Sequence, residues 1–202
     1  TAGPNESVGG SRYQVNIIEY DVLLSGTGEL ANGGTVSYQA SILIDGYTSI
    51  GQSAFQTTYV GLVIIPNSVT SIGEYAFQNC QSLTSITFTF EEYGQYPLLT
   101  SIGQYAFYNC QDLTSISIPY SVTSIGQYAF YYCSALTSIT FGQNSQLTSI
   151  DQYTFQYCSA LTSISIPDSV TSIGQSAFQY CSALTSITFG QNSQLTSIGT
   201  GA

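Results

Sequence analysis

One eight-residue phrase recurs along this chain and constrains its fold more than any other feature. The phrase Thr-Ser-Ile-Gly-x-x-Ala-Phe occurs six times, once with two exchanges, and a seventh copy begins at Thr196 and is incomplete. The six starts are Thr48, Thr70, Thr100, Thr123, Thr148 and Thr171. Successive starts lie 22, 30, 23, 25, 23 and 25 residues apart. A repeat of this length cannot bury its apolar side alone, so successive copies are expected to stack into a solenoid.

Within each repeat the apolar residues keep fixed positions. One copy places them at Val122, Ile125, Ala129, Phe130, Cys133, Leu136, Ile139 and Phe141. Two short β-branched pieces per repeat predict strands, and the segment between them is too short for a full helix and predicts a tight or 3₁₀ turn. Stacked coils bring parallel strands about 4.8 Å apart. We therefore predict a repeat solenoid, mainly β, made of coils of about 23–25 residues.

The repeat also resembles a known family. The pattern L-T-S-I-S-I-P-x-S-V-T-S-I-G-x-x-A-F-x-x-C resembles the BspA-type leucine-rich repeat, and the resemblance covers residues 41–199. It implies a leucine-rich-repeat stack in a secreted or surface-attached protein with an adhesive or structural, non-catalytic role. The chain departs from the family in its near absence of charge on exposed positions.

Three regions follow from composition and repeats. Residues 1–11 form a Gly- and Pro-containing tail that is expected to be flexible, and residues 12–40 form an N-terminal β segment, which serves as a cap or an inter-subunit strand. Residues 41–202 form the solenoid, whose last repeat is incomplete. Residues 12–24 predict one strand with a bulge at Ile17 and Ile18, and residues 26–34 predict a loop before a second strand at 35–44.

The glycine of the recurring phrase predicts a local backbone feature. It occupies one position of the repeat at Gly51, Gly73, Gly103, Gly126, Gly174 and Gly199, and Asp151 replaces it once. Glycine and aspartate tolerate left-handed backbone better than most residues. We therefore predict a turn of positive φ at this position, with Asp151 in a structural role.

Composition excludes several functions. Only 6% of the residues are charged, the formal net charge is −10, and Arg12 is the single cation. Nucleic acid and anionic membranes need basic surfaces, so neither is an expected partner. No apolar run is long enough to insert into a membrane. The sequence contains no His and no Lys, which removes most acid–base and nucleophile-activating schemes, and an enzyme or a cofactor is not expected.

The cysteines share one position of the repeat. An odd number at repeat spacing, without a CxxC pair or any His, does not predict a disulfide framework or a metal site. They are expected to be buried free thiols of the core. These residues are Cys80, Cys110, Cys133, Cys158 and Cys181.

Two exposed arrays are candidate surfaces. Ser138 and Thr140 are expected to point outward with equivalent hydroxyls in register, as a solvated, glycan-bearing or ice-binding face. A tyrosine array either packs along its own solenoid edge or contacts a partner. Its members are Tyr75, Tyr105, Tyr128, Tyr153, Tyr132, Tyr157 and Tyr180.

The favoured functional hypothesis is self-assembly. The chain stops just inside a new repeat, and an uncapped coil exposes core side chains that a second copy could cover head to tail. We therefore predict a secreted protein that polymerises into an extracellular filament or sheath. The candidate assembly residues are Tyr13, Val15, Ile17, Ile18, Tyr20, Val22, Leu195 and Ile198.

Two alternatives remain open at this point. The chain is alternatively a cell-surface adhesin that recognises a host protein or glycan, or, as a minor alternative, an ice-binding protein. Secretion or a cell-surface location fits a chain that begins at Thr1 without Met and carries an N-glycosylation sequon at Asn5.

Overall fold

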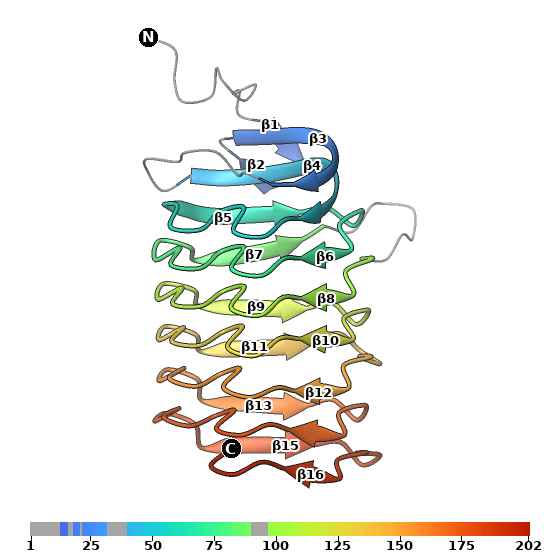
Figure 1. Ribbon diagram of the computed structural model, residues 1–202, viewed down its shortest axis with the longest axis vertical. Coiled ribbons are helices and arrows are strands. Elements are labelled where there is room, and N and C mark those ends of the chain that lie inside the picture. Colours follow the sequence, from blue (N-terminus) through green and yellow to red (C-terminus); the bar gives the residue numbers. More distant parts are fainter. Residues whose placement is uncertain (1–12, 16–17, 21, 32–39, 90–96) are drawn as a thin grey trace.

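The computed structural model describes residues 13–15, 18–20, 22–31, 40–89 and 97–202. These residues form a long stack of parallel β coils, with the N-terminal strands at one end and residue 202 at the other (Figure 1). No helix occurs among them, and hence none that could cross a membrane. The predicted β-solenoid is confirmed.

The N-terminal segment differs from the expected single bulged strand. β1 (Tyr13–Val15) and β2 (Ile18–Tyr20) pair antiparallel as a hairpin. β3 (Val22–Leu30) then runs parallel to β4 (Ala40–Ile50). The prediction of a loop over residues 26–34 is therefore wrong for residues 26–30, which belong to β3. Two register shifts between Ser25 and Glu29 let the glycines there join the strand.

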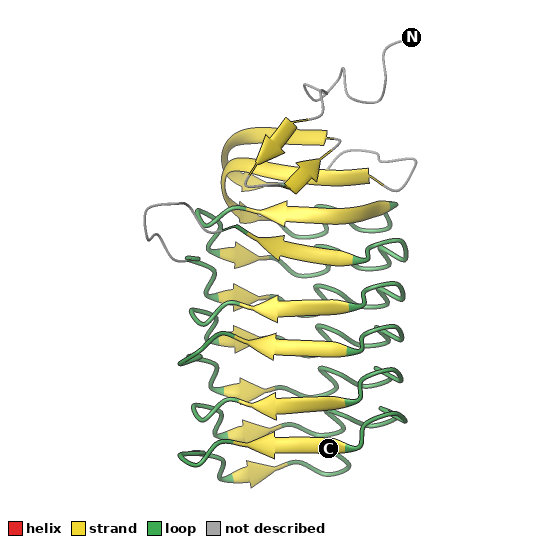
Figure 2. Cartoon of the chain, turned by 180° about the vertical axis from the view of Figure 1, so that it is seen from behind, coloured by secondary structure: helices red, strands yellow, loops and turns green. Residues whose placement is uncertain are grey.

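Each later coil contributes one longer and one shorter strand, and the two rows lie on opposite sides of the stack (Figure 2). The longer row comprises β5 (Val60–Ile65), β7 (Ser85–Phe88), β9 (Ser115–Ile118), β11 (Ser138–Phe141), β13 (Ser163–Ile166) and β15 (Ser186–Phe189). The shorter row comprises β6 (Ser71–Ile72), β8 (Ser101–Ile102), β10 (Ser124–Ile125), β12 (Ser149–Ile150), β14 (Ser172–Ile173) and β16 (Ser197–Ile198).

Equivalent residues of neighbouring coils lie above one another. Ser138 pairs with Ser115 and Ile139 with Ile116, so hydroxyls and isoleucines form separate columns. The isoleucines face the core, where one phenylalanine per coil stacks on the next with ring centroids 4.9–5.5 Å apart. These columns give the stack a continuous apolar interior.

Threonine hydroxyls add a second ladder at the starts of the strands. The Thr123 Oγ1 donates to the carbonyl of Thr100 at 3.1 Å, and the Thr137 Oγ1 donates to the carbonyl of Thr114 at 3.0 Å. The same bond recurs from Thr70 to Thr196. A hydroxyl-bearing residue at this position therefore ties each coil to the preceding one.

Positive φ occurs in the turns, but not at the predicted glycine. Twelve non-glycine residues of the turn segments have φ between 52° and 64°, two per turn. They are Ser53, Thr57, Tyr75, Asn79, Tyr105, Asn109, Tyr128, Tyr132, Tyr153, Tyr157, Ser176 and Tyr180. This arrangement lets alternate N–H groups bond to the next coil: Phe55 N donates to Ala76 O at 2.7 Å, and Gln56 N closes a turn onto Ser53 O at 3.0 Å.

The recurring glycine has a different cause. A Cβ built on Gly103 would lie 2.6 Å from the carbonyl carbon of Gly73, and one on Gly174 would lie 2.5 Å from the amide nitrogen of Gln152. The position is therefore reserved for glycine by close backbone approach, and the prediction of positive φ there is wrong.

Asp151 shows what a side chain does at this position. Gly126 N donates to Ile102 O at 2.9 Å and Gly174 N to Ile150 O at 2.7 Å, whereas the described hydrogen bonds include none from Asp151 N to Ile125. Both rows of strands are also interrupted here, because β10 does not pair with β12 and β11 does not pair with β13. The Asp151 carboxylate accepts a hydrogen bond from the Ser149 hydroxyl at 2.9 Å.

Candidate functional site

An open groove of about 1140 Å³ lies over the longer row of strands. Its floor is the outer face of β7, β9 and β11, and its lining is mostly hydroxyl, amide and ring groups. The polar members are Ser85, Thr87, Ser115, Ser117, Ser138, Thr140, Gln143, Asn144 and Gln146, and the rings are Phe88, Pro97, Pro119, Tyr120 and Phe141.

The strand alternation produces the floor of the groove. In β9 and β11 the serines and Thr140 are exposed while the isoleucines between them are buried, as the sequence predicted for Ser138 and Thr140. Ser117 and Thr140 lie in register, and their hydroxyl oxygens are 2.6 Å apart. The floor thus offers paired hydroxyls that both donate and accept.

The longer link after β11 forms one wall. Gly142 lets this link cross closely over Tyr120, because a Cβ there would lie 2.7 Å from the Tyr120 amide nitrogen. Gln146 N donates to Tyr120 O at 2.8 Å, and the Gln146 Nε2 donates to Asn144 O at 2.9 Å. Sequence reasoning missed this wall, although the longer spacing between repeats marks the link.

No charged side chain is among the described residues that line the groove. A smaller cavity of about 370 Å³ adjoins it across Thr140, Phe141 and Asn144 and contains one carboxylate, Asp168. One oxygen of that carboxylate, Oδ1, is buried without a hydrogen-bond partner. The described lining of the larger groove therefore offers hydrogen-bonding groups and rings but no ion-pair partner.

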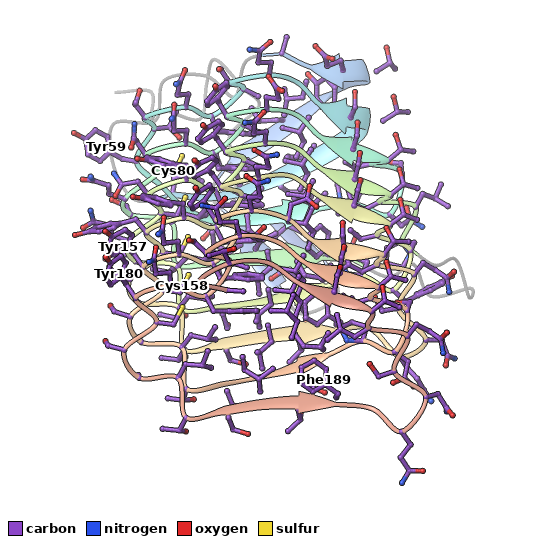
Figure 3. The ribbon with its side chains drawn as sticks, turned by 60° about the horizontal axis from the view of Figure 1, so that its bottom comes forward. Tyr59, Cys80, Tyr157, Cys158, Tyr180 and Phe189 are labelled. Carbon is purple, nitrogen blue, oxygen red and sulfur yellow. The ribbon has the colours of Figure 1, made fainter. Side chains whose placement is uncertain are left out.

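The seven candidate tyrosines lie on the turns, away from the groove residues. Tyr75, Tyr105, Tyr128 and Tyr153 stack in one ladder with centroids 4.7–5.0 Å apart. Tyr157 lies between Tyr132 at 5.6 Å and Tyr180 at 4.6 Å. Figure 3 shows Tyr157 and Tyr180 next to each other at the edge formed by the turns.

Two further tyrosines, which sequence reasoning did not single out, join these ladders. Tyr108 stacks on Tyr131 at 4.9 Å, and Tyr131 also contacts Tyr128 and Tyr157. Partial burial, and then the neighbouring phenols, raise the pKa of Tyr128 and Tyr131. The sequence could have indicated both residues, because each lies within three residues of a tyrosine that was already a candidate.

All five cysteines are buried free thiols in one column. Each Sγ donates to a phenylalanine carbonyl of the neighbouring coil at 2.9–3.2 Å. Burial raises the pKa of Cys133 from 9.0 to about 12, and it raises the pKa of Cys110 and Cys158 well above 9.0. These thiols are therefore poor nucleophiles near neutral pH. Within the described ranges no group of His, Cys, Asp or Glu could hold a metal ion.

The candidate assembly residues fall into two groups. Ile198 in β16 is 63% exposed, whereas Leu195 is partly buried against the core. Ile187 and Phe189 of β15 are also exposed, which the sequence analysis missed. Tyr13, Val15, Ile18, Tyr20 and Val22 lie in β1, β2 and β3, while Ile17 and the sequon at Asn5 lie outside the described residues.

The comparison with known families agrees with this repeat geometry. Residues 48–98 and 100–202 match the BspA type Leucine rich repeat region in six copies. The chain belongs to the BspA-type leucine-rich repeat family. The resemblance seen in the sequence is thereby confirmed for most of the chain, including every residue of the groove floor.

Two solved structures share the fold of this BspA-type chain. The pneumococcal vaccine antigen PcpA is 23% identical with a TM-score of 0.66, and the match covers 91% of this chain and 51% of that one. The Treponema pallidum leucine-rich repeat protein TpLRR is 22% identical with a TM-score of 0.51, covering 72% of this chain and 78% of that one. The chain thus spans about half the length of the PcpA chain. No curated protein matches it significantly.

Proposed function

We propose that this BspA-type repeat protein is an extracellular binding module that holds an uncharged glycan in the groove over β7, β9 and β11. The observation that carries the proposal is the lining itself, which combines hydroxyls, amides and rings and contains no charge among its described residues. Sugar hydroxyls both donate and accept hydrogen bonds, as do the side chains of the groove floor. The rings at its rim supply the apolar contact that binding sites usually need.

Charge and shape support this ligand class over the alternatives. The net charge of −10 repels anionic polymers, and an uncharged groove gives a cationic ligand no ion-pair partner. A hollowed face fits a bound chain better than it fits the flat plane of an ice crystal. A secreted or cell-surface location is part of the proposal, since an extracellular glycan must be reachable.

The test compares two equivalent threonines. Thr140→Val removes a hydroxyl from the groove, and we expect binding to a neutral polysaccharide to weaken by about tenfold, because a lost hydrogen bond in a binding site costs about 1–1.5 kcal/mol. Thr188→Val removes the equivalent hydroxyl of β15, which lies outside the groove lining, and should leave binding unchanged. Isothermal titration calorimetry with the hits of a glycan array provides the measurement.

Equal effects of the two valine substitutions would contradict the proposal, as would an array on which no neutral glycan binds. Preferential binding to anionic glycans would contradict it as well.

Self-assembly is the second candidate function. The specific observation in its favour is the row of apolar side chains exposed on the last coil, Ile187, Phe189 and Ile198. Phe189 is labelled at that end in Figure 3. Further repeats of the same chain or a second copy would cover this row equally well, and polymerisation commits to the second copy.

Electron microscopy over a concentration series tests this candidate. We expect filaments from the chain and none from Phe189→Asp, because a charge on the exposed row opposes burial against a second copy. Ser186→Asp, on the same strand but at a hydroxyl position, is the matched control and should still assemble. Monomers at every concentration, or filaments that persist in Phe189→Asp, would count against self-assembly through this end.

A further inference from the structure

Nine tyrosines form one connected network of ring contacts along the turns. Neighbouring centroids lie 4.6–6.4 Å apart, and stacked pairs alternate with edge contacts. The members are Tyr75, Tyr105, Tyr108, Tyr128, Tyr131, Tyr132, Tyr153, Tyr157 and Tyr180. No residue of this network lines the groove.

Backbone strain shows that these tyrosines are not the easiest residues to place here. Seven of the nine have φ between 56° and 64°, as in Tyr128 and Tyr180. Left-handed backbone costs an ordinary residue about 1–2 kcal/mol, and Asn or Gly bears it more easily. In two other coils, Asn79 and Asn109 occupy the turn position that Tyr180 occupies in its own coil, so the fold accepts asparagine at this position. A stacked aromatic pair returns about 0.5–1.5 kcal/mol beyond the area that it buries. The left-handed turn positions also accept Ser53, Thr57 and Ser176, so the turn itself does not require tyrosine.

Composition leaves tyrosine as the accessible oxidisable side chain. The sequence has no Met, no Trp and no His. All five cysteine thiols are buried, each donates a hydrogen bond to a backbone carbonyl, and burial raises the pKa of each. Tyr180 is 58% exposed and Tyr132 is 42% exposed, and both contact Tyr157. One-electron oxidants that meet the described surface therefore react at tyrosines, and the network is where nine tyrosine rings lie in mutual contact.

We propose that the tyrosine network is a site of oxidative cross-linking, in which Tyr157 and Tyr180 form dityrosine between adjacent coils. The oxidant is hydrogen peroxide used by a haem peroxidase. One hydrogen atom leaves each phenol, and the two atoms reduce one peroxide molecule to two waters. The two phenoxyl radicals join ortho carbon to ortho carbon, and each displaced ring hydrogen returns to a phenol oxygen.

The geometry favours this pair for coupling within one chain. The Tyr157 and Tyr180 rings stack at 4.6 Å with an interplanar angle of 17°, so the two radicals need no encounter between molecules. Exposure lets the Tyr180 ring turn into the edge-to-edge arrangement that the new carbon–carbon bond requires. The product is a covalent link between coils that are 23 residues apart in the sequence.

The experiment treats the folded chain with peroxidase and hydrogen peroxide. We expect dityrosine fluorescence in a monomer that has lost two hydrogen atoms by intact mass, with Tyr157–Tyr180 as the main linked peptide. Tyr157→Phe keeps the ring but cannot form a phenoxyl radical, so this linked peptide should disappear and intrachain dityrosine should fall by about twofold or more. Oxidation of the urea-unfolded chain should give about tenfold less intrachain product, since the rings are no longer held together.

Tyr59→Phe is the matched control, because Tyr59 is exposed directly before β5 and does not belong to the network. It should leave the yield of the Tyr157–Tyr180 link unchanged. Dityrosine found only in covalent dimers, or an intrachain yield that is the same in the folded and unfolded chains, would overturn the proposal.

Discussion

Replacing Phe107 by alanine is expected to lower the free energy of unfolding by about 3–5 kcal/mol. Phe107 is completely buried, and its ring lies between those of Phe77 and Phe130 at 5.1 Å on each side. Alanine removes both stacking contacts and leaves a cavity that the neighbouring coils cannot close, because their own backbones are fixed by bonds such as Phe107 N to Ala129 O. Urea unfolding followed by circular dichroism measures the change.

Phe189→Ala is the control for this prediction. Phe189 is partly exposed at the last coil, so its loss should cost far less than that of Phe107. Equal costs for the two substitutions would mean that the phenylalanine column does not hold the stack together.

Replacing Gly103 by alanine is expected to cost about 1–3 kcal/mol, although it adds a single methyl group. The added Cβ would lie 2.6 Å from the Gly73 carbonyl carbon and 2.7 Å from the Glu74 amide nitrogen. The two coils must separate, which weakens the 2.8 Å hydrogen bond from Gly103 N to Ile72 O. Denaturant unfolding measures the loss, and amide hydrogen exchange at Gly103 reports the weakened bond directly.

The adjacent substitution Gln104→Ala provides the comparison. It truncates a partly exposed side chain without adding atoms between the coils, so stability should change by less than about 0.5 kcal/mol. If Gly103→Ala proved as mild as Gln104→Ala, close approach of the backbones would not explain the recurring glycine.

The repeat period and its apolar positions were enough to predict the stack. In a solenoid, residues that recur once per repeat stack on one another, so apolar residues at a fixed position of the repeat must form the buried core. Ile139 and Phe130 could be assigned to the core, and Ser138 and Thr140 to the surface, from alternation alone. The sequence could not show how the turn distributes its hydrogen bonds. Positive φ was therefore assigned to the glycine, when it falls on residues such as Tyr128 and Tyr132.

The candidate site was predictable only in part. The alternation of exposed and buried residues located the hydroxyls of its floor, but a groove also needs a wall beside that floor. Its wall comes from a link whose path is set by Gly142 crossing over Tyr120, a contact between residues 22 positions apart. The N-terminal hairpin was missed for a similar reason, since Ile17 and Ile18 interrupt the alternation in the same way for a bulge as for a reversal of direction.

Asp151 divides a regular rod into two unequal blocks. At this step the strands on both sides of the stack are not paired with those of the preceding coil. The two coils remain joined by turn hydrogen bonds such as Phe130 N to Thr154 O at 2.9 Å and by the hydrogen bond that the Thr148 hydroxyl donates. The apolar columns also continue across the step. In a linear array, unfolding stops where coupling between neighbours is weakest. Under tension along its axis, the molecule would therefore part first at this joint, and the block that begins with β12 (residues 149–202) would come away from an N-terminal block that is still intact.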